Sequence, residues 1–554
     1  MANPTLPQSK HWLDKVVDGI LQWQDKYQVE QLHVDDMKTP SGRVHTGALR
    51  GVLLHDLVAQ VLRERGLSPT NTYVFNDMDP MDGLPAYLDE AVFGEHMGKP
   101  LYQIPKPSLD QCGIDLSQAS AAELADLEQA RNFAEVYAVD FIHAFRSLGC
   151  TPEIVWSHEL YESGAMDPFI RVALDSVDKM RGIYQQVAKY ELPERWYPFQ
   201  VICPVCGKVG TTLVTDWDGE QVTYECQPAK VTWAKGCGNT GKVSPFGGTG
   251  KLLWKVDWPA HWAAMGVNVE GAGKDHSSAG GSRDMANAQC EQVFNITVPF
   301  NIPYEWILIR GAKMSSSKGV GTSAREFTKL FPPAIGRFLF ASRNYSQVID
   351  FDPQTMAIPD LFDEYDQGAR LAWGEEEGDM RQARAFQLAQ ITGQVQSPSF
   401  LPRFRDVALW MQYPDKDLLE EFAKVKGSPL NEVERALLEE RQHYAQIWLK
   451  HYAPAEYQLT PRPELPAAVA QLSSEQRAFL LELRDLLNKQ PDLAASELQQ
   501  AIFDLAKQSV GPRKGFESIY LLLLGKKAGP RAGWLLRAVE TELLESRFQA
   551  LEQL

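Results

Sequence analysis

Pro40-Ser41-Gly42-Arg43-Val44-His45-Thr46-Gly47 stands between a predicted strand at 31–35 and a predicted helix at 46–65. Apolar residues of the helix recur at the three- and four-residue spacing of one buried face: Leu49, Val52, Leu53, Leu57, Val58, Val61 and Leu62. A second strand is predicted at 72–76. Strand, turn, helix and strand form a βαβ unit, which predicts a parallel sheet with its ligand at the carboxyl edge of the strands.

A second stretch, Lys313-Met314-Ser315-Ser316-Ser317-Lys318-Gly319, follows a predicted buried strand at 307–310. Two lysines around three serines offer positive charge and hydroxyl donors to a polyphosphate. In the first stretch, glycines leave room at a helix N-terminus and His45 can donate to a phosphate oxygen. Together the two stretches predict in-line attack on the α-phosphate of ATP, with the serine loop closing as pyrophosphate leaves.

Length and charge limit the class of protein. The chain has 554 residues, which predicts several domains. No apolar run reaches the length of a membrane span, and the polar N-terminus lacks the core of a signal peptide, so we expect a soluble, cytoplasmic protein without membrane contact. A net charge of −17 disfavours a nucleic-acid-binding surface over the whole molecule, but a local basic patch at 511–537 is compatible with RNA.

Four of the seven cysteines fall in one Gly-, Thr- and Cys-rich segment, 201–250, which we expect to be a small β-rich module. Cys203-x-x-Cys206 with Cys226 and Cys237 fits a structural Cys₄ zinc site, because four thiolates leave no open coordination position. The alternative is four buried or redox-active cysteines. The remaining three, Cys112, Cys150 and Cys290, are expected to be small buried residues.

Three further segments narrow the interpretation. They are Lys-Leu-Leu-Trp-Lys-Val-Asp-Trp-Pro-Ala-His-Trp at 251–262, the glycine-rich stretch at 270–284, and Ile-Tyr-Leu-Leu-Leu-Leu-Gly-Lys-Lys at 519–527 with Gly-Pro-Arg at 529–531. Together with the two stretches above, they resemble the class I, archaeal-type lysyl-tRNA synthetases from about residue 39 to residue 536.

The resemblance implies a Rossmann-type parallel sheet split by a connective insertion with a zinc module, followed by an all-α anticodon-binding region. The implied domains are two Rossmann halves at 1–90 and 251–322, an insertion at 91–250 with its zinc module at about 201–250, a stem-contact region at 323–385, and a helical anticodon-binding domain at 386–554. The implied reaction joins lysine and ATP into lysyl-adenylate and then transfers lysine to the 2′-hydroxyl of the terminal adenosine of lysine tRNA.

The resemblance also implies ligands and site residues. ATP, Mg²⁺ and a structural Zn²⁺ are the implied cofactors; lysine and the acceptor end and anticodon of lysine tRNA are the implied partners, with a monomer among the possible oligomeric states. Catalytic roles fall on His45, Lys313 and Lys318. ATP contacts fall on Ser41, Gly42, His45, Gly47, Gly273, Asp275, Gly280, Gly281, Lys313, Met314, Ser315, Ser316 and Ser317. The lysine pocket falls on Asp36, Thr39, Trp254, His276 and Tyr304.

Two positions depart from the family pattern. Ala48 stands where asparagine is usual, and Ser316 stands where lysine is usual, so Lys318 is inferred to supply the missing charge. The lysine ammonium needs a buried acid or an aromatic face. The candidate acids are Asp36, Asp257, Glu270 and Asp284, and the sequence does not rank them.

Other interpretations stay open. A glutamyl-type class I synthetase shares the helical anticodon end, and a synthetase paralogue could bind tRNA or adenylate without charging. The run of acids at Asp77, Asp79 and Asp82 is interpreted as a polar turn at the insertion boundary that could contact the acceptor end of tRNA, with a metal cluster as the alternative.

Overall fold

The computed structural model describes residues 11–311, 322–391, 397–413, 416–459, 461 and 464–553. Within them the chain forms two compact units. One unit comprises the described residues of Met1–Asp352 and Gln367–Ser397, and the other those of Pro353–Asp366 and Pro398–Leu554. Helix α13 (Ala357–Trp373) runs across this division. The five-part domain plan is finer than these two units and stays a prediction.

The predicted βαβ unit is present at the start of the first unit. It consists of β1 (His33–Lys38), the 3₁₀ turn η1 (Thr46–Ala48), α2 (Leu49–Glu64) and β2 (Thr70–Phe75), and β1 and β2 pair in parallel. Strand β1 begins two residues later and ends three residues later than expected. The polar residues Asp35, Asp36 and Lys38 make the end of the strand difficult to predict from the sequence, yet backbone pairing with β2 continues through all three.

The parallel sheet is assembled from distant parts of the chain. Strand β3 (Glu153–Trp156) pairs with the far side of β2, and parallel bridges join Val34 to Val269 and Val269 to Phe300. The short strands β9 (Ala272–Gly273) and β10 (Pro303–Tyr304) extend this pairing. The segment between β3 and residue 269 is therefore inserted into the sheet, and the carboxyl ends of β1 and β9 meet at one edge.

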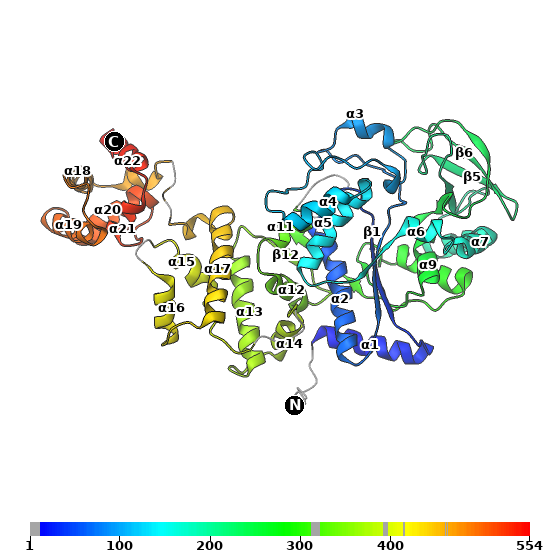
Figure 1. Cartoon of the computed structure of the whole chain (residues 1–554), viewed down its shortest axis with the longest axis horizontal. Coiled ribbons are helices and arrows are strands. Elements are labelled where there is room, and N and C mark those ends of the chain that lie inside the picture. Colours follow the sequence, from blue (N-terminus) through cyan, green and yellow to red (C-terminus); the bar gives the residue numbers. More distant parts are fainter. Residues whose placement is uncertain are drawn as a thin grey trace. The chain divides into compact units, whose positions relative to one another are not determined.

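Helices hold the sheet in place. α2 is buried on nearly all sides from Leu49 to Ala59, as expected for a helix enclosed between layers. It packs against α1 (Trp12–Tyr27), α5 (Phe133–Ser147) and α12 (Pro333–Ser342). Figure 1 shows α1 and α2, both in blue, beside the long strands of the sheet. The first turn of α1 is fixed by Trp12, whose indole donates to the main-chain oxygen of Ala341 at 2.8 Å.

The inserted segment combines helices with a β-rich part, which confirms the expectation for 201–250. The strands pair antiparallel as β5-β6-β7 and β4-β8. The elements around and within the insertion are α3 (Glu90–Phe93), η2 (Gly94–His96), η3 (Leu101–Gln103), α4 (Ala121–Gln129), α6 (Ser157–Glu162), α7 (Asp167–Asp175), α8 (Val177–Ala188), β4 (Phe199–Val201), β5 (Thr212–Trp217), β6 (Val222–Cys226), β7 (Thr240–Val243), β8 (Gly250–Leu252), α9 (Trp254–Met265), α10 (Ser282–Gln289) and the π-helical turn η4 (Cys290–Phe294).

The first unit ends with a second parallel strand pair and short helices. Strand β11 (Ile307–Ile309), predicted from its apolar run, pairs with β12 (Ile349–Phe351). The chain then forms α11 (Ala324–Thr328), α12 and α14 (Met380–Leu388). Arg337 of α12 reaches Asp56 of α2 at 2.7 Å, a buried ion pair that fixes these helices to each other.

The regular elements in the described part of the second unit are all helices. Its elements are α15 (Phe404–Trp410), α16 (Leu418–Lys426), α17 (Glu432–His451), η5 (Ala455–Tyr457), η6 (Ala467–Gln471), α18 (Ser474–Lys489), α19 (Ala495–Gln508), α20 (Pro512–Leu524), α21 (Ala532–Ala538) and α22 (Thr541–Glu552). Figure 1 shows α18 to α22 gathered as one bundle near the C-terminus. The predicted mixed α/β part and helical C-terminal part are both confirmed. Among the described helices, none is long and apolar enough to cross a membrane.

Candidate active site and cysteine cluster

A cavity of about 260 Å³ opens at the carboxyl edge of the sheet. It collects side chains from β1, the start of α2, β9 and β10, which are distant in sequence. Seven of the predicted site residues line it: Asp36, His45, Gly47, Gly273, Asp275, His276 and Tyr304. The remaining lining residues are Met37, Lys38, Ala48, Arg50, Tyr73, Trp306 and Ile307. The structure therefore brings seven of the thirteen predicted ATP and lysine residues that it describes to one place.

His45 lies directly before the helical turn that leads into α2. A Cβ atom on Gly47 would lie 2.7 Å from two atoms of the His45 ring, closer than real contacts allow. Glycine at position 47 therefore lets the imidazole fold back over the helix start. Backbone donors at a helix N-terminus together with an imidazole form a site suited to a phosphate.

The main chain beside His45 pairs with the residues that follow the serine loop. His45 and Ser323 form an antiparallel bridge, and the N–H of Thr46 donates to the oxygen of Thr322 at 3.1 Å. On the other side of the loop, β11 ends at Ile309, and its first residue Ile307 lines the cavity. Both ends of the loop are thus anchored at the cavity. The predicted loop residues Lys313, Met314, Ser315, Ser316, Ser317 and Lys318 lie outside the described residues.

Asp36 is a buried acid on the cavity wall. A Cβ atom on Gly51 would lie 2.5 Å from Asp36 Oδ2 and 3.0 Å from the Tyr304 hydroxyl, so both side chains press against the backbone of α2. The one basic side chain at ion-pair distance from Asp36 in the described part of the chain is His55, 3.7 Å away. Burial lowers the pKa of His55 to about 4, so this imidazole is neutral at physiological pH.

The carboxyl of Asp36 therefore forms no ion pair with a lysine or arginine among the described residues, although the charge of Lys38, in the lining of the same cavity, acts to lower its pKa. Burial, reinforced by the charge of Glu270, holds the pKa of Asp36 well above its usual range. A buried acid of this kind favours a ligand that brings a positive charge with it.

The other three candidate acids are engaged elsewhere. Asp257 contacts Lys251 at 3.2 Å. Glu270 accepts hydrogen bonds from the indoles of Trp258, at 2.8 Å, and Trp262. Asp284 accepts from the N–H of Gly280 at 2.8 Å. Of the four acids, Asp36 is the one that lines the cavity.

A second cavity, of about 490 Å³, lies on the insertion side of β1. Three predicted site residues, Thr39, Ser41 and Trp254, line this cavity and not the first. Trp254 nevertheless reaches toward the first cavity, because its ring lies 5.3 Å from that of His276 in an edge-to-face contact. Gly280 and Gly281 are outside both linings, in the turn before α10. Gly42 has a φ of +149°, which favours glycine in the turn after β1.

Arg50 is a cavity residue that the sequence interpretation missed. Its guanidinium is buried, and Nη2 donates to the main-chain oxygen of Asn344 at 2.7 Å. Burial lowers the pKa of Arg50 to about 10, and its Nε has no hydrogen-bond partner. The feature of the sequence that could have indicated Arg50 is its place on α2, two residues after Ala48. A cation here adds positive charge beside the position that departs from the family pattern.

The run of acids after β2 forms ion pairs. Asp77 pairs with His158 of α6, and Asp79 pairs with Lys251 of β8. This supports the polar-turn interpretation. Among the described residues, only the four cysteines form a group of metal-binding side chains.

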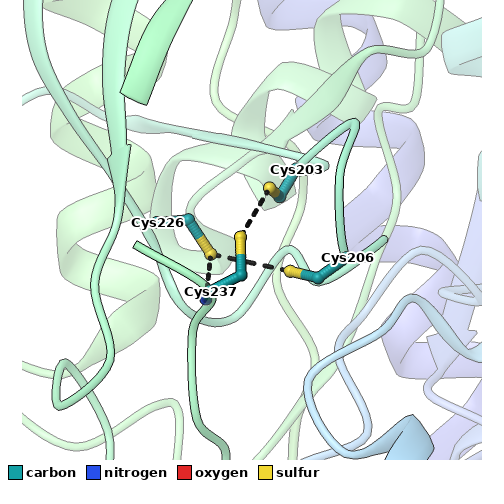
Figure 2. Close-up of side chains that lie close together, drawn as sticks. All are labelled: Cys203, Cys206, Cys226 and Cys237. Atoms are coloured by element: carbon teal, nitrogen blue, oxygen red, sulfur yellow. Dashed lines mark hydrogen bonds between the residues drawn. The ribbon is translucent and has the colours of Figure 1, made fainter. Parts of the chain in front are cut away.

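The cysteine cluster joins two turns of the β-rich part. The sulfurs of Cys203, Cys206, Cys226 and Cys237 all lie within 4.8 Å of one another. Figure 2 shows the four side chains pointing toward a common centre. The Cys203–Cys237 and Cys206–Cys226 sulfurs are 3.6 and 3.7 Å apart, close to the ~3.8 Å expected between thiolates around a tetrahedral zinc.

Backbone geometry supports the cluster. Gly207 has a φ of +70°, and its N–H donates to the oxygen of Cys203 at 2.7 Å, which closes the first turn. In the second turn, a Cβ atom on Gly236 would lie 2.4 Å from the main-chain oxygen of Gln227. The remaining cysteines, Cys112, Cys150 and Cys290, are buried and free, as expected.

Comparison with known proteins identifies the family. The lysine–tRNA ligases of Methanosarcina barkeri (strain Fusaro / DSM 804) and Archaeoglobus fulgidus are 31% and 30% identical to this chain, covering 97% and 98% of it and 97% and 99% of their own lengths. Among solved structures, a glutamate tRNA ligase from Elizabethkingia meningosepticum aligns over 95% of this chain and 99% of its own, with 12% identity and a TM-score of 0.38. Because that structural similarity is low, the assignment rests on sequence. The family described as "tRNA synthetases class I (K)" matches residues 10–392, and the chain belongs to this family.

Proposed function

We propose that this chain is a lysine–tRNA ligase, which activates lysine with ATP and transfers it to the 2′-hydroxyl of the terminal adenosine of lysine tRNA. The observation that carries the proposal is the shared cavity of Asp36 and His45. One wall offers a buried acid that forms no ion pair with a lysine or arginine of the described residues, and the other offers an imidazole at a helix start. A substrate with an ammonium at one end and a carboxylate to be joined to a phosphate satisfies both walls.

The first step requires positioning more than proton transfer. The lysine carboxylate is already a nucleophile, so one of its oxygens attacks the α-phosphorus while the bond to the pyrophosphate oxygen breaks. His45 and the backbone at the start of α2 hold the phosphates in line. Lys313 and Lys318, on the loop between β11 and Thr322, neutralise the charge on the departing pyrophosphate. Mg²⁺ bound with ATP would supply further charge neutralisation.

Asp36 supplies the specificity for lysine. The ε-ammonium replaces the missing counter-charge, and its arrival favours the ionised carboxylate, so lysine binding at neutral pH releases a proton. Tyr304 and His276 complete the wall around the aliphatic stem. A glutamate side chain brings no positive charge to pair with Asp36, so the cavity disfavours the glutamyl-type alternative.

A structural zinc ion completes the β-rich part of the insertion. The distances among the four sulfurs and the two glycine turns fit a tetrahedral Cys₄ site, with Cys203, Cys206, Cys226 and Cys237 as ligands. Zinc bound there would tie the turn at 203–207 to the turn at 226–238 and stabilise the fold around them. It has no role in the reaction steps.

The remaining parts are assigned to tRNA and to folding units. We propose a stem-contact region at 323–385 and an anticodon-binding region at 386–554, both reached by the tRNA while its acceptor end enters the active site. Charging by a monomer and a cytoplasmic location stay predictions.

The experiment that tests the proposal is ATP–pyrophosphate exchange with each amino acid, with and without tRNA, followed by charging of lysine tRNA. Lysine-dependent exchange and lysyl-tRNA formation are expected. Exchange with glutamate alone would favour the glutamyl-type enzyme, and exchange without charging would favour the non-charging paralogue. The tRNA arm is needed because some class I enzymes form the adenylate only in its presence.

A further inference from the structure

Lys251 is a buried cation between two acids from different parts of the fold. It lies in β8, within the inserted segment, and its side chain is 2% exposed. Its ammonium contacts Asp79, in the turn after β2, and Asp257, in α9, the latter at 3.2 Å. The mechanism above does not use any of these three residues.

On one side, the ion pair fixes Thr39. Asp79 accepts a hydrogen bond from the Thr39 hydroxyl at 2.6 Å through Oδ2, while Oδ1 contacts Lys251. Thr39 directly follows β1, whose residue Asp36 lines the first cavity. The two oxygens of one carboxylate therefore link the end of β1 to the inserted segment.

On the other side, the ion pair fixes the start of α9. Asp257 is one helical turn after Trp254, the first residue of α9, and it also contacts Tyr161 and His261. Trp254 in turn contacts His276, which lines the first cavity. Lys251 thus stands between Thr39 and Trp254, and all three line the second cavity.

The charges of this cluster balance when His261 is protonated. Burial disfavours the charged imidazole, but the neighbouring Asp257 carboxylate outweighs burial and raises the pKa of His261. Two carboxylates then face an ammonium and an imidazolium. Without Lys251 the cluster would carry net negative charge, and Asp79 would lose the cation that holds it against Thr39.

We propose that Lys251 is a positioning residue for amino-acid binding, which acts through Asp79 on Thr39 and through Asp257 on Trp254. It holds the two sides of the amino-acid site at a fixed separation and connects that site to the inserted segment. The proposal rests on the proposed function, because the family resemblance assigns Thr39 and Trp254 to the lysine pocket and Trp254 contacts His276 of the first cavity. Loss of Lys251 should therefore weaken binding of the amino acid and leave ATP binding nearly intact.

The first test compares Lys251→Met with Lys242→Met. Lys242 carries the same charge in the same β-rich part, but its ion pair with Asp218 is exposed. We expect Lys251→Met to raise the KM for lysine at least tenfold and to change the KM for ATP less than threefold, and Lys242→Met to change neither. Equal changes in both KM values for Lys251→Met would show a general loss of folding and overturn the proposal.

The second test is a double-mutant cycle with Thr39→Val, and Thr39→Ser as the variant that keeps the hydroxyl. If Lys251 acts through Asp79 on Thr39, Lys251→Met and Thr39→Val together should cost less than the product of their separate effects. Multiplicative effects, or a Thr39→Ser enzyme as impaired as Thr39→Val, would refute the linkage.

A second variant covers the case in which Lys251→Met fails to fold, and the choice of amino acid covers the case in which lysine is not the substrate. If Lys251→Met does not fold, the pair Lys251→Met/Asp79→Asn removes one charge of each sign, and its KM for lysine should match that of Thr39→Val. The cycle is measured with whichever amino acid stimulates exchange in the wild-type enzyme. Failure of lysine to do so would refute the proposed function, whereas an additive cycle would refute the role of Lys251.

Discussion

The side-chain hydroxyl of Thr46 donates a hydrogen bond to the main-chain oxygen of Thr322, 2.9 Å away and 276 residues later in the chain. This contact joins the histidine-bearing turn to the residue that follows the serine loop. Because neighbouring backbone pairs reinforce it, the end of the loop has a fixed position beside His45.

Gly47→Ala should slow adenylate formation while leaving the fold intact. The added methyl group would lie 2.7 Å from the His45 ring and displace it from the helix start. We expect a loss of roughly 100-fold in the exchange rate, the scale of a misplaced catalytic group. Gly182→Ala is the matched control: it lies in α8 with no neighbour within 4 Å and should keep full activity. An unchanged rate for Gly47→Ala would contradict the role of His45.

Asp36→Asn should weaken lysine binding selectively. The amide has the shape of the carboxyl group but cannot form a charge-assisted hydrogen bond with the ammonium, which is worth about 1.5–3 kcal/mol, or roughly 10- to 100-fold. The KM for lysine in pyrophosphate exchange should rise by this factor, and the KM for ATP should not. Asp284→Asn, which removes a competing candidate acid, should leave the KM for lysine unchanged; the opposite pattern would transfer the role to Asp284.

Purified protein should contain one equivalent of zinc per chain. Cys206→Ser should lose the metal and lower the unfolding temperature, because the two turns are then no longer linked. Metal analysis and thermal unfolding measure both effects. Cys112→Ala, which changes a buried cysteine outside the cluster, should keep its zinc. Metal-free wild-type protein of full stability would refute the site.

Because of Glu270, the free energy of unfolding should decrease as the pH rises. Burial raises the pKa of Glu270 from 4.5 to about 7 in the fold. The folded state therefore holds this proton more tightly than the unfolded chain, so the contribution is complete below pH ~4.5 and is lost as the pH approaches 7. From ~1.4 kcal/mol per pKa unit, the contribution is about 3 kcal/mol.

Glu270→Gln stays neutral and should lack this dependence. Denaturant unfolding between pH 4.5 and 7.5 should show the stability of the wild type declining relative to that of the variant. Glu291→Gln, an exposed position in the same segment, should follow the wild type. Parallel curves for wild type and Glu270→Gln would mean that Glu270 is ionised throughout.

The inference that Lys318 replaces the lysine usual at position 316 can be tested by moving the positive charge from one position to the other. Lys318→Ala should lower the exchange rate with little effect on lysine affinity, since the lost contact belongs to the transition state. Adding Ser316→Lys to the same chain should restore much of the rate, because it returns a lysine to the position usual in the family. Failure of Ser316→Lys to rescue would show that Lys318 does more than supply charge.

Much of the fold was predictable because local patterns and tertiary packing agree. The apolar periodicity of α2 and the cysteine-rich segment at 201–250 were recognised directly. The bounds predicted for β1 differ from the observed ones because four of its six residues are polar or charged, and only pairing with β2 and with Val269 makes them strand residues. The sequence indicated the individual site residues, but nothing in it indicated that Thr39 and Asp36 line two different cavities.

The sequence alone determined which chemical groups this protein contains. They are a histidine at a predicted helix start, a serine loop with two lysines, and four cysteines with a spacing that suits a zinc site. Residue type and local spacing carry that information, because each motif is contained in a short segment. Only the tertiary structure decided between the candidate acids. Asp36 and Asp257 are both buried, and they differ in their ion-pair partners and in which of them lines the first cavity. Both differences depend on segments that are far apart in the sequence, such as β1 and the segment that follows Glu270, and that meet when the chain folds.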